Sequence, residues 1–314
     1  MKNDAPVVAT KRSLRSRMWS CRYLYLMSLP AVLYYLLLAY LPMFGITIAF
    51  TDYKLGSGVA GFFTSPWNNF ANFRVMFESV FFFSVLRNTL VISVLKLVTG
   101  FPMPIIIALM LNEMRSQRFK NVVQGFSYLP HFLSWVIVAS MIYQLLAPTT
   151  GAITKLLAST FGVNLNVFTV PKNFLVMLIL SNLWKGTGWG TVVYMAAISS
   201  IDPTYYEAAQ IDGATRWQRL RYITLPSIIP TMIIVLILNL SSILSAGFDQ
   251  IFNLYNSMVM SVADIIDTYV YREGMTNSKY GFSTAVGLFK SVISVILIVG
   301  SDRFIRKIGY RGIF

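Results

Sequence analysis

A polar segment between two long apolar runs carries residues whose types and spacing suit them to binding another protein. It reads Tyr205-Tyr206-Glu207-Ala208-Ala209-Gln210-Ile211-Asp212-Gly213-Ala214 and is followed by Ile223-Thr224-Leu225-Pro226. The segment is acidic at its start, interrupted by glycine and basic at its end, which is more than a connection between two membrane helices requires. We therefore predict that residues 202–226, called the docking loop below, bind a soluble partner.

Local signals predict that the docking loop begins with two short helices. Asp202 is a good N-cap, and Pro203 falls at the first helical position, where a missing N–H removes no hydrogen bond. Gly213 can adopt the left-handed conformation that ends such a helix, and Thr215 can cap a second helix that runs to Tyr222. Two short helices that meet at a glycine form a compact knob on one side of a membrane.

Polar side chains inside the apolar runs form a second candidate site, because placing them in lipid is costly. They recur at helical spacing in two neighbouring runs, as Asn182, Lys185, Gly186 and Trp189 and as Asn239, Ser242 and Ser245. An indole stacked on a pyranose ring, beside amide and hydroxyl hydrogen bonds, would make a substrate path for a sugar. The alternative is that asparagine and serine hydrogen-bond neighbouring helices, as they do in many membrane bundles.

Charged residues in or near the apolar runs also leave two interpretations open. Lys96 and Lys290 either line a water-filled cavity or extend their ammonium groups to the membrane surface. Asp264 and Asp267, with Asp249, could bind a cation. Two aspartates three residues apart in a loop nevertheless favour a solvated face over a cation site.

The sequence contains no set of residues for catalysis or for a metal site. One histidine, His131, and one cysteine cannot form a catalytic triad or a cluster of His and Cys ligands. The stretch from Lys185 to Gly190 superficially resembles a phosphate-binding loop, but it lies inside an apolar run and lacks the Gly-Lys-Ser/Thr order. If the chain works in an ATP-driven machine, the nucleotide chemistry must lie on another polypeptide.

Composition excludes an ordinary soluble domain, since 56% of residues are hydrophobic, 12% are charged and the mean hydropathy is +0.63. Runs long enough to span a hydrocarbon core of ~30 Å cover Tyr23–Phe50, Asn88–Leu111, Val122–Leu146, Phe174–Ser199, Ser227–Ala246 and Ala285–Gly300. Because these runs are continuous, we predict an all-α polytopic membrane protein with six transmembrane helices. Interruptions are expected in the second, third and fourth runs, at Pro102, Pro104, Pro130, Gly186, Gly188 and Gly190.

The net charge of +14 comes mainly from Lys and Arg at both termini, between the second and third runs and in the docking loop. Threading six spans places these regions on one side of the membrane, and the positive-inside rule assigns that side to the cytoplasm. We therefore predict one membrane domain, residues 23–309, between a basic cytoplasmic segment, residues 1–22, and a cytoplasmic tail, residues 310–314. The basic residues reflect topology, and a nucleic-acid partner is not expected.

The docking loop resembles the EAA loop of permease subunits in ATP-binding cassette (ABC) importers. The family pattern is Glu-Ala-Ala, three residues, Gly, nine residues, Ile, one residue and Leu-Pro. Every interval is kept by Glu207-Ala208-Ala209, Gly213, Ile223 and Leu225-Pro226. From about Tyr23 onward the chain also resembles carbohydrate-uptake permeases of the maltose-permease-like family, closest to the subgroup that handles oligosaccharide fragments of polysaccharides. Stretches that carry this second resemblance include Tyr40-Leu41-Pro42-Met43, Ser127-Tyr128-Leu129-Pro130-His131, Trp184-Lys185-Gly186 and Gly287-Leu288-Phe289-Lys290.

The resemblance implies a type I ABC importer permease fold with a cytoplasmic coupling loop. It implies that Glu207 pairs with a basic residue of an ATPase subunit, while Ala208, Ala209 and Gly213 permit close approach. The implied coupling site is completed by Asp212, Leu225 and Pro226. The implied partners, in a bacterial cytoplasmic membrane, are a second homologous permease, two ATP-binding subunits that hold ATP and Mg²⁺, and an extracytoplasmic solute-binding protein.

Two alternatives to an ABC importer remain at the level of sequence, an ion-driven secondary sugar transporter and a membrane scaffold that transports nothing. A scaffold would explain the helices but not the spacing of the docking loop. An ion-driven secondary sugar transporter is expected to carry acidic residues within its spans. The 12 acidic residues of this chain lie in loops or at span edges, which argues against this alternative. The substrate is either a neutral or an acidic, uronate-containing oligosaccharide. Lys96, Lys185 and Lys290 favour an acidic one only if their ammonium groups line the path without a counter-charge.

Overall fold

The computed structural model describes residues 19–307 and residue 309 of the 314-residue chain. These residues form helices joined by short turns, and the β contact found among them is a single bridge between Thr51 and Trp67. Most of the predicted N-terminal segment 1–22 and all of the predicted tail 310–314 lie outside the described residues. The all-α architecture predicted from the sequence is confirmed.

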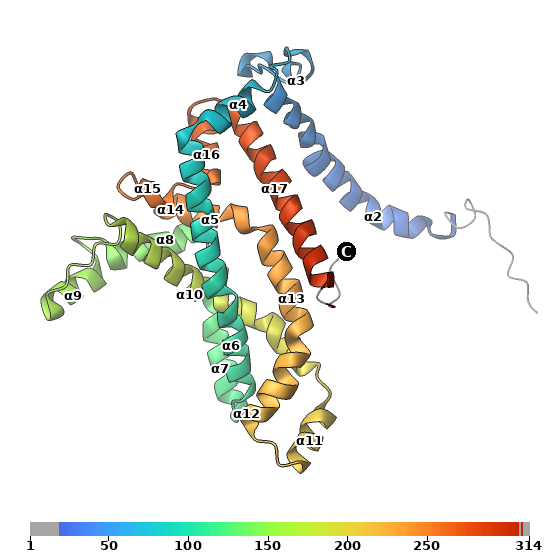
Figure 1. Cartoon of the computed structure of the whole chain (residues 1–314), viewed down its shortest axis with the longest axis vertical. Coiled ribbons are helices and arrows are strands. Elements are labelled where there is room, and N and C mark those ends of the chain that lie inside the picture. Colours follow the sequence, from blue (N-terminus) through green and yellow to red (C-terminus); the bar gives the residue numbers. More distant parts are fainter. Residues whose placement is uncertain (1–18, 308, 310–314) are drawn as a thin grey trace, which may run out of the picture.

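The N-terminal part of the first predicted span stands apart from the rest of the molecule, while its last residues, which include the buried Ile48 and Ala49, pack on α17 (Tyr280–Lys307) (Figure 1). The span consists of α2 (Arg22–Tyr35), a π-helical turn η1 (Leu36–Tyr40) and a 3₁₀-helical segment η2 (Leu41–Phe50), which together form 29 residues of helix. Within its most apolar 18-residue window, only 6% of the residues are buried. An apolar helix with so little contact to its own chain is suited to lipid or to another membrane protein.

Four of the other apolar runs form long helices. They are α5 (Val80–Gly100) with α6 (Pro102–Asn112), α10 (Pro171–Ser199), α12 (Arg216–Arg219) with η5 (Leu220–Thr224) and α13 (Leu225–Ser241), and α17 (Tyr280–Lys307). The run around Pro130 instead forms α7 (Gln117–Tyr128) with η4 (Leu129–Phe132), followed by α8 (Trp135–Leu146) at an angle of 101°. The bend falls where Leu133 is extended and the Ser134 hydroxyl caps α8 by accepting from the Ile137 N–H.

By length and apolar composition, the described residues contain four membrane-spanning helices, or five if the bent pair counts as one. The predicted number of six is not reached by this measure. The remaining candidate, α10, is long enough at 29 residues, but Asn182, Lys185 and its glycines lower its hydropathy. The expected interruption at Pro102 and Pro104 is limited to one residue, Phe101, between α5 and α6, and the two helices still form one span of 33 residues.

Gly188 and Gly190 of α10 serve close packing, and no glycine interrupts the helix between Pro171 and Ser199. A Cβ atom on Gly188 would lie 1.9 Å from the carbonyl oxygen of Ser127 on α7, and one on Gly190 would lie 2.9 Å from Cγ of Pro104 on α6. Small residues let helix backbones approach closely in membrane proteins. The prediction that these glycines loosen the span is therefore wrong, since they allow α10 to lie against α6 and α7.

The substitution Gly188→Ala is expected to lower the stability of the protein by about 2 kcal/mol, because its Cβ would overlap a backbone atom that side-chain rotation cannot move. The matched control is Gly287→Ala on α17, where a Cβ atom meets nothing within 4 Å. There, the higher helix propensity of alanine should leave the midpoint of thermal unfolding equal or higher. Equal midpoints for the two variants in detergent would contradict the packing role of Gly188.

Short helices form both ends of the molecule. At the upper end in Figure 1, they include η3 (Leu55–Ser57), α3 (Gly61–Thr64), α4 (Ala71–Glu78), α16 (Ile266–Tyr271) and η7 (Arg272–Thr276). Helices α14 (Phe248–Leu254) and α15 (Met260–Ala263) lie nearer the middle, α9 (Ala152–Phe161) packs on α8, and η6 (Ile243–Ser245) follows α13. The lower end is formed by α11 (Pro203–Ile211) and α12.

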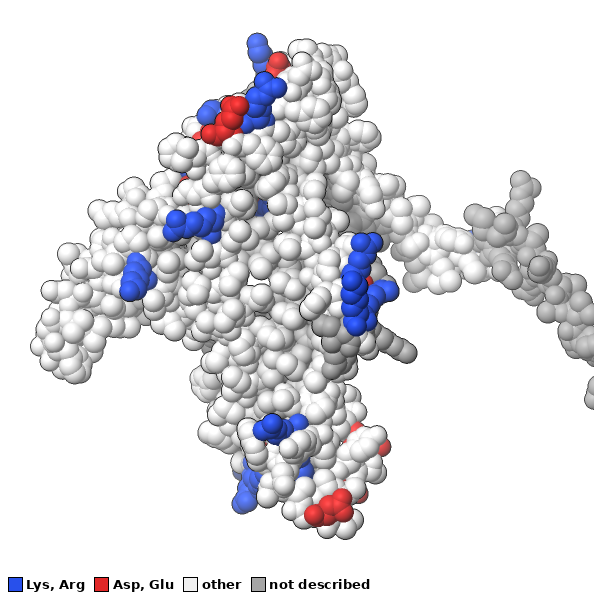
Figure 2. All heavy atoms as spheres, viewed as in Figure 1, with Lys and Arg blue, Asp and Glu red and all other residues white. Residues whose placement is uncertain are grey.

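Buried apolar side chains form three clusters that fix the long helices relative to one another. One cluster joins α5 and α10 to α14 and α15, a second joins α4, α5, α16 and α17, and a third joins α6, α10 and α13. Since α5, α10 and α13 each belong to at least one cluster, burial of apolar area holds the three helices that carry the predicted polar path residues. Over much of the face in Figure 2 the surface is uncharged, as the hydrocarbon region of a membrane requires.

Candidate functional site

The first helix of the docking loop and the caps on both short helices have the local structure that the sequence predicted. The Asp202 carboxylate accepts from the Thr204 N–H at 2.9 Å, which lowers the pKa of Asp202, and Pro203 opens α11. Gly213 ends the helix with φ +76°, and its N–H donates to the Gln210 carbonyl at 3.1 Å. Thr215 and Gln218 then form a reciprocal capping box that starts α12. The knob is thus fixed by hydrogen bonds among neighbouring residues.

One contact ties α11 to the base of the long helix that follows. The Tyr206 hydroxyl lies 2.8 Å from Oγ1 of Thr224, and Thr224 is buried. On the other faces of the knob, Glu207, Ala208, Asp212 and Gly213 are exposed, and Ala209 is half-buried. Figure 2 shows acidic side chains at this end of the molecule. The knob is therefore anchored by one face and presents the residues of the predicted coupling site on the others.

The second helix of the knob differs from the prediction that it ends at Tyr222. Helix α12 passes through the π-helical turn η5 directly into α13, so one helix runs from Arg216 to Ser241. Pro226, which was expected to open a separate run, lies inside this continuous helix, shortly after the π-helical turn η5, and has no N–H to donate there. Leu225 is half-buried there and Pro226 is exposed. One continuous helix therefore connects the knob to the membrane region of the chain.

A cavity of about 360 Å³, called the central cavity below, lies between α5, α6, α10 and α13. Four of the predicted path residues line it, namely Asn182 and Gly186 from α10, Asn239 from α13 and Ser242 just after α13. Lys96 from α5 and Tyr194 from α10 line it as well. The structure therefore brings amide, hydroxyl and ammonium groups from separate helices to one cavity.

Lys185, Trp189 and Ser245 are not among the residues that line the central cavity. The Lys185 ammonium donates to the His131 carbonyl at 2.7 Å, and the Trp189 ring is stacked on the His131 ring with centroids 4.8 Å apart. A helix turns by about 100° per residue, so Lys185 points well away from Gly186. The single face expected from the spacing is divided: one part faces the cavity and the other packs on η4.

The fifth span is broken close to the cavity, at a position the sequence did not reveal. The α-helix ends at Ser241, and after η6 both Ala246 and Gly247 are left-handed, with φ +46° and +81°. The Lys96 ammonium donates to the Ala246 carbonyl at 2.7 Å and to Oε1 of Gln250 at 2.5 Å. The break therefore leaves a carbonyl inside the membrane region that is satisfied by a lysine from another helix.

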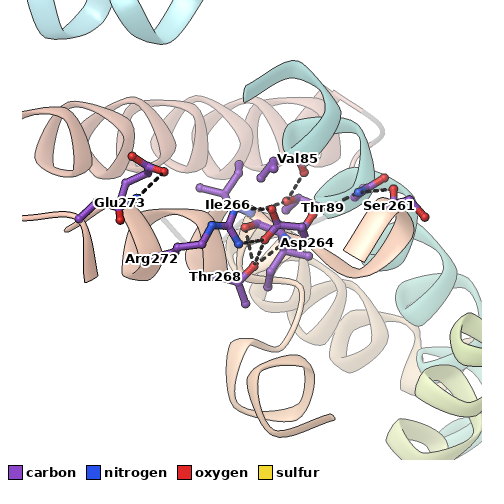
Figure 3. A network of polar contacts seen from close by, with 11 residues as sticks. Val85, Thr89, Ser261, Asp264, Ile266, Thr268, Arg272 and Glu273 are labelled. Atoms are coloured by element: carbon purple, nitrogen blue, oxygen red, sulfur yellow. Dashed lines mark hydrogen bonds and ion pairs between the residues drawn. The ribbon is translucent and has the colours of Figure 1, made fainter. Parts of the chain in front are cut away.

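Asp264 lies in a buried polar network and not on a solvated face, so that part of the sequence interpretation is wrong. Its carboxylate accepts from the Arg272 guanidinium at 2.6 and 3.1 Å and from the Thr268 hydroxyl at 2.8 Å (Figure 3). In the same network, Thr89 on α5 accepts from the Ile266 N–H at 2.9 Å. The spacing of Asp264, Thr268 and Arg272 at four-residue intervals was the signal that could have revealed it.

Lys290 and Asp267 form a second ion pair. The two carboxylate oxygens of Asp267 lie 2.6 and 2.8 Å from the Lys290 ammonium, which joins α16 to α17. Lys290 therefore carries a counter-charge from its own chain, and Asp267 is likewise not on a solvated face. Of the three lysines that the sequence offered for binding an acidic sugar, Lys290 no longer supports the hypothesis.

A larger cavity of about 1500 Å³ lies at the α3 and α16 end of the molecule. Its lining is rich in hydroxyl, amide and charged groups, including Thr51, Lys54, Asn72, Ser84, Arg272 and Lys279. These residues come from two parts of the chain that are far apart in sequence, which is why no sequence pattern indicated the cavity. Among the described residues, no group of three or more His, Cys, Asp or Glu side chains could hold a metal ion.

Residues 100–310 match the model of the family described as "Binding-protein-dependent transport system inner membrane component". The whole chain is 43% identical over 315 residues to Protein LplB of Bacillus subtilis (strain 168), covering 98% of that protein. It is 42% identical over 293 residues to the Polygalacturonan/rhamnogalacturonan transport system permease protein YteP of the same organism, covering 93% of this chain and 90% of YteP. The chain belongs to the family of binding-protein-dependent inner membrane transport components.

The fold is similar to that of a solved bacterial ABC transporter involved in the import of the acidic polysaccharide alginate. The match covers 94% of this chain and 99% of the other, with 39% sequence identity and a TM-score of 0.87. A second structure of the alginate transporter, in complex with an alginate pentasaccharide-bound periplasmic protein, gives the same TM-score. The predicted ABC importer permease fold is confirmed, and with it the alternative of an ion-driven carrier is excluded. The chain is a multi-pass inner membrane transport subunit and not an enzyme.

Proposed function

We propose that this chain is a permease subunit of an ATP-driven importer that carries uronate-containing oligosaccharides across a bacterial cytoplasmic membrane. The similarity over 94% of the chain to a transporter of the acidic polysaccharide alginate carries this proposal. The relative YteP, named for polygalacturonan and rhamnogalacturonan transport, supports the same substrate class. Alginate and polygalacturonan are both built from sugars that bear carboxylates.

The importer would contain three kinds of protein partner. The family description and the complex with a periplasmic protein support an extracytoplasmic solute-binding protein that delivers the oligosaccharide. A second homologous permease would enclose the path, and the little-buried first span offers a surface for it. Two ATP-binding subunits would hold ATP and Mg²⁺ and hydrolyse the nucleotide below the docking loop.

The docking loop is the proposed coupling site. Glu207 would pair with a basic residue of an ATP-binding subunit, while the small side chains of Ala208, Ala209 and Gly213 allow that subunit to approach closely. The remaining members of the proposed site are Asp212, Leu225 and Pro226. ATP binding would close the two ATP-binding subunits, and the continuous helix from Arg216 to Ser241 would carry the resulting motion to the central cavity. Different contacts of the knob in the two ATPase states would couple hydrolysis to transport.

The proposed substrate path runs along the central cavity. Asn182, Asn239 and Ser242 would hydrogen-bond sugar hydroxyls there, and Gly186 leaves room for the chain of the oligosaccharide. Lys185, Trp189 and Ser245 lie outside the lining of the cavity, and the indole of Trp189, which stacks on His131, would contact a pyranose ring only on the η4 side of α10. Oligosaccharide would enter through the larger polar cavity at the opposite end from the docking loop.

The basic segments support an orientation with both termini and the docking loop in the cytoplasm. The larger polar cavity and the short helices α3, α4 and α16 would then face outward. Labelling of single cysteines placed at exposed positions in α3 and α12 with a membrane-impermeant maleimide tests this orientation in intact cells. Only the cysteine in α3 should react.

Substitutions of residues that line the central cavity are expected to lower sugar uptake more than substitutions of residues just outside the lining. Asn182→Ala and Asn239→Ala should each lower uptake about fivefold, because each removes hydrogen bonds worth about 1 kcal/mol to the passing sugar. Ser245→Ala, just outside the lining, serves as the comparison and should have a smaller effect. The effect of each substitution is measured as the initial uptake rate in proteoliposomes. Equal rates for all three variants would show that the two asparagines have only a structural role.

The proposed function is tested by reconstituting the chain with its partner permease, ATP-binding subunits and solute-binding protein. Uptake of radiolabelled trigalacturonate should require ATP and the loaded binding protein. Uptake that proceeds without ATP would refute the mechanism. Failure to take up trigalacturonate, together with uptake of neutral oligosaccharides, would refute the substrate class.

A further inference from the structure

Lys96 is the one charged residue that lines the central cavity in the part of the chain that the structure describes. It lies on α5, and the facing walls carry Asn182, Asn239 and Ser242. No aspartate or glutamate is among the described residues of this lining. The cavity thus combines neutral hydrogen-bonding groups with a single ammonium group.

The contacts of Lys96 leave its charge unbalanced. Its ammonium donates to the Ala246 carbonyl at 2.7 Å and to the Gln250 side-chain oxygen at 2.5 Å, and both acceptors are neutral. The amide nitrogen of Gln250 donates in turn to the Leu178 carbonyl and the Ser181 hydroxyl, so this side chain is held in place. An ammonium has three donors, and two contacts leave the third for another acceptor.

The other two lysines that the sequence offered do not place an unbalanced charge in the central cavity. Lys290 is neutralised by Asp267 at 2.6 Å. Lys185 donates to the His131 carbonyl and lies outside the central cavity. The geometry therefore selects one of the three lysines that the sequence offered as a group able to face an anionic sugar in the path.

A carboxylate in this cavity would interact strongly with Lys96. Charges near the surface of a protein attract each other several-fold more strongly than charges in bulk water, because the effective dielectric is lower. Asn182 approaches α5 about one helical turn after Lys96. Its Nδ2 atom lies 3.9 Å from the position that a Cβ atom on Gly100 would occupy. A uronate near Lys96 would therefore have an amide donor close by for its hydroxyl groups.

We propose that Lys96 is a specificity-determining residue, which selects sugars that bear a carboxylate as they pass the central cavity. This inference rests on the proposed function, in which the chain carries oligosaccharides. Uronate units gain an ion pair with Lys96 that neutral units cannot form. Asn182, Asn239 and Ser242 bind hydroxyl groups that both kinds of sugar share.

Lys96 also stabilises the break in the fifth span by donating to the Ala246 carbonyl. The experiment must therefore separate this structural role from the proposed role in selecting acidic sugars. Loss of a structural contact would lower the transport of acidic and neutral sugars alike. Loss of selectivity would change the ratio between them. The ratio of uptake rates is thus the readout that a merely structural role does not move.

The test uses the complete reconstituted importer and two probes, trigalacturonate and the neutral trisaccharide made by reducing its carboxyl groups. Uptake of each is measured with the binding protein saturated by that sugar, so that its own affinity does not enter the ratio. Lys96→Gln is expected to lower the acidic-to-neutral ratio about tenfold, because it removes the charge. Lys96→Arg keeps the charge and should keep most of the ratio.

A second variant leaves Lys96 and its hydrogen bonds in place. Asn182→Asp adds a carboxylate to the lining beside α5 and should lower the same ratio by neutralising the ammonium. If the importer with Lys96→Gln fails to assemble, the uptake ratio of the Asn182→Asp variant decides whether the charge of Lys96 determines selectivity. The control is Lys172→Gln, which removes an exposed cation at the start of α10, away from the cavity, and should leave the ratio at the wild-type value.

The outcomes are distinguishable. A lower ratio in Lys96→Gln and Asn182→Asp, with the ratio kept in Lys96→Arg, supports the assignment. An unchanged ratio in Lys96→Gln with slower uptake of both sugars overturns it and leaves Lys96 as a structural cap. If the wild-type importer takes up neither sugar, the proposed function itself fails and the assignment fails with it.

Discussion

Replacing Gly213 by proline should lower binding-protein-stimulated ATP hydrolysis and sugar uptake roughly tenfold or more. Gly213 has φ +76°, which proline cannot adopt because its ring fixes φ near −65°, and proline also lacks the N–H that donates to Gln210. The knob would lose its shape while the central cavity stays intact. Coupling free energies between sites are typically about 1–3 kcal/mol, so loss of the knob accounts for an effect of this size. Both rates are measured in proteoliposomes of the assembled complex.

Gly213→Asn is the matched control, because asparagine tolerates the left-handed conformation and its Cβ would meet nothing within 4 Å in the isolated chain. Near-normal coupling in this variant shows that the loop needs the backbone conformation. Coupling as poor as in Gly213→Pro shows instead that the ATP-binding subunit approaches too closely for any side chain. Wild-type uptake in Gly213→Pro itself would rule out the docking loop as the coupling element.

Arg272→Met should destabilise the assembled protein by about 3 kcal/mol, the largest stability effect expected for a single ion pair here. The residue Asp264 is 7% exposed, and the substitution leaves its carboxylate with the Thr268 hydroxyl as the remaining side-chain donor. A buried carboxylate without a counter-charge is costly, because burial removes its hydration. The midpoint of thermal unfolding of the purified complex measures the loss.

Two further variants separate the buried ion pair from general effects of charge. Asp264→Asn combined with Arg272→Met should recover more than half of the loss, because no unpaired charge then remains buried. Lys279→Met breaks the pair with Glu273, in which the lysine side chain is 61% exposed, and should cost less than about 1 kcal/mol. Equal losses for Arg272→Met and Lys279→Met would contradict the special role of the buried network in Figure 3.

The parts of the molecule that the sequence predicted well are those governed by local rules. Continuous apolar runs must be helical in lipid, since only backbone hydrogen bonds within the segment can satisfy its N–H and C=O groups. The cap at Asp202 and the left-handed Gly213 depend on partners no more than three residues away. The same locality explains why the fixed spacing of the docking loop was enough to indicate the class of protein.

What the sequence could not decide depends on pairs of groups that meet only in the folded chain. Lys290 and Asp267 are 23 residues apart, and Lys96 and Ala246 are 150 apart, so no local pattern shows that one lysine is neutralised while the other faces a cavity. Helical spacing grouped Asn182 with Trp189. In the folded chain Asn182 faces the cavity beside α5, whereas Trp189 packs on His131 of η4. The sequence determined which residues form helices and how the docking loop is built. The tertiary structure alone decided which polar side chains share a cavity, because charge balance and hydrogen bonding depend on distances in space and not along the chain.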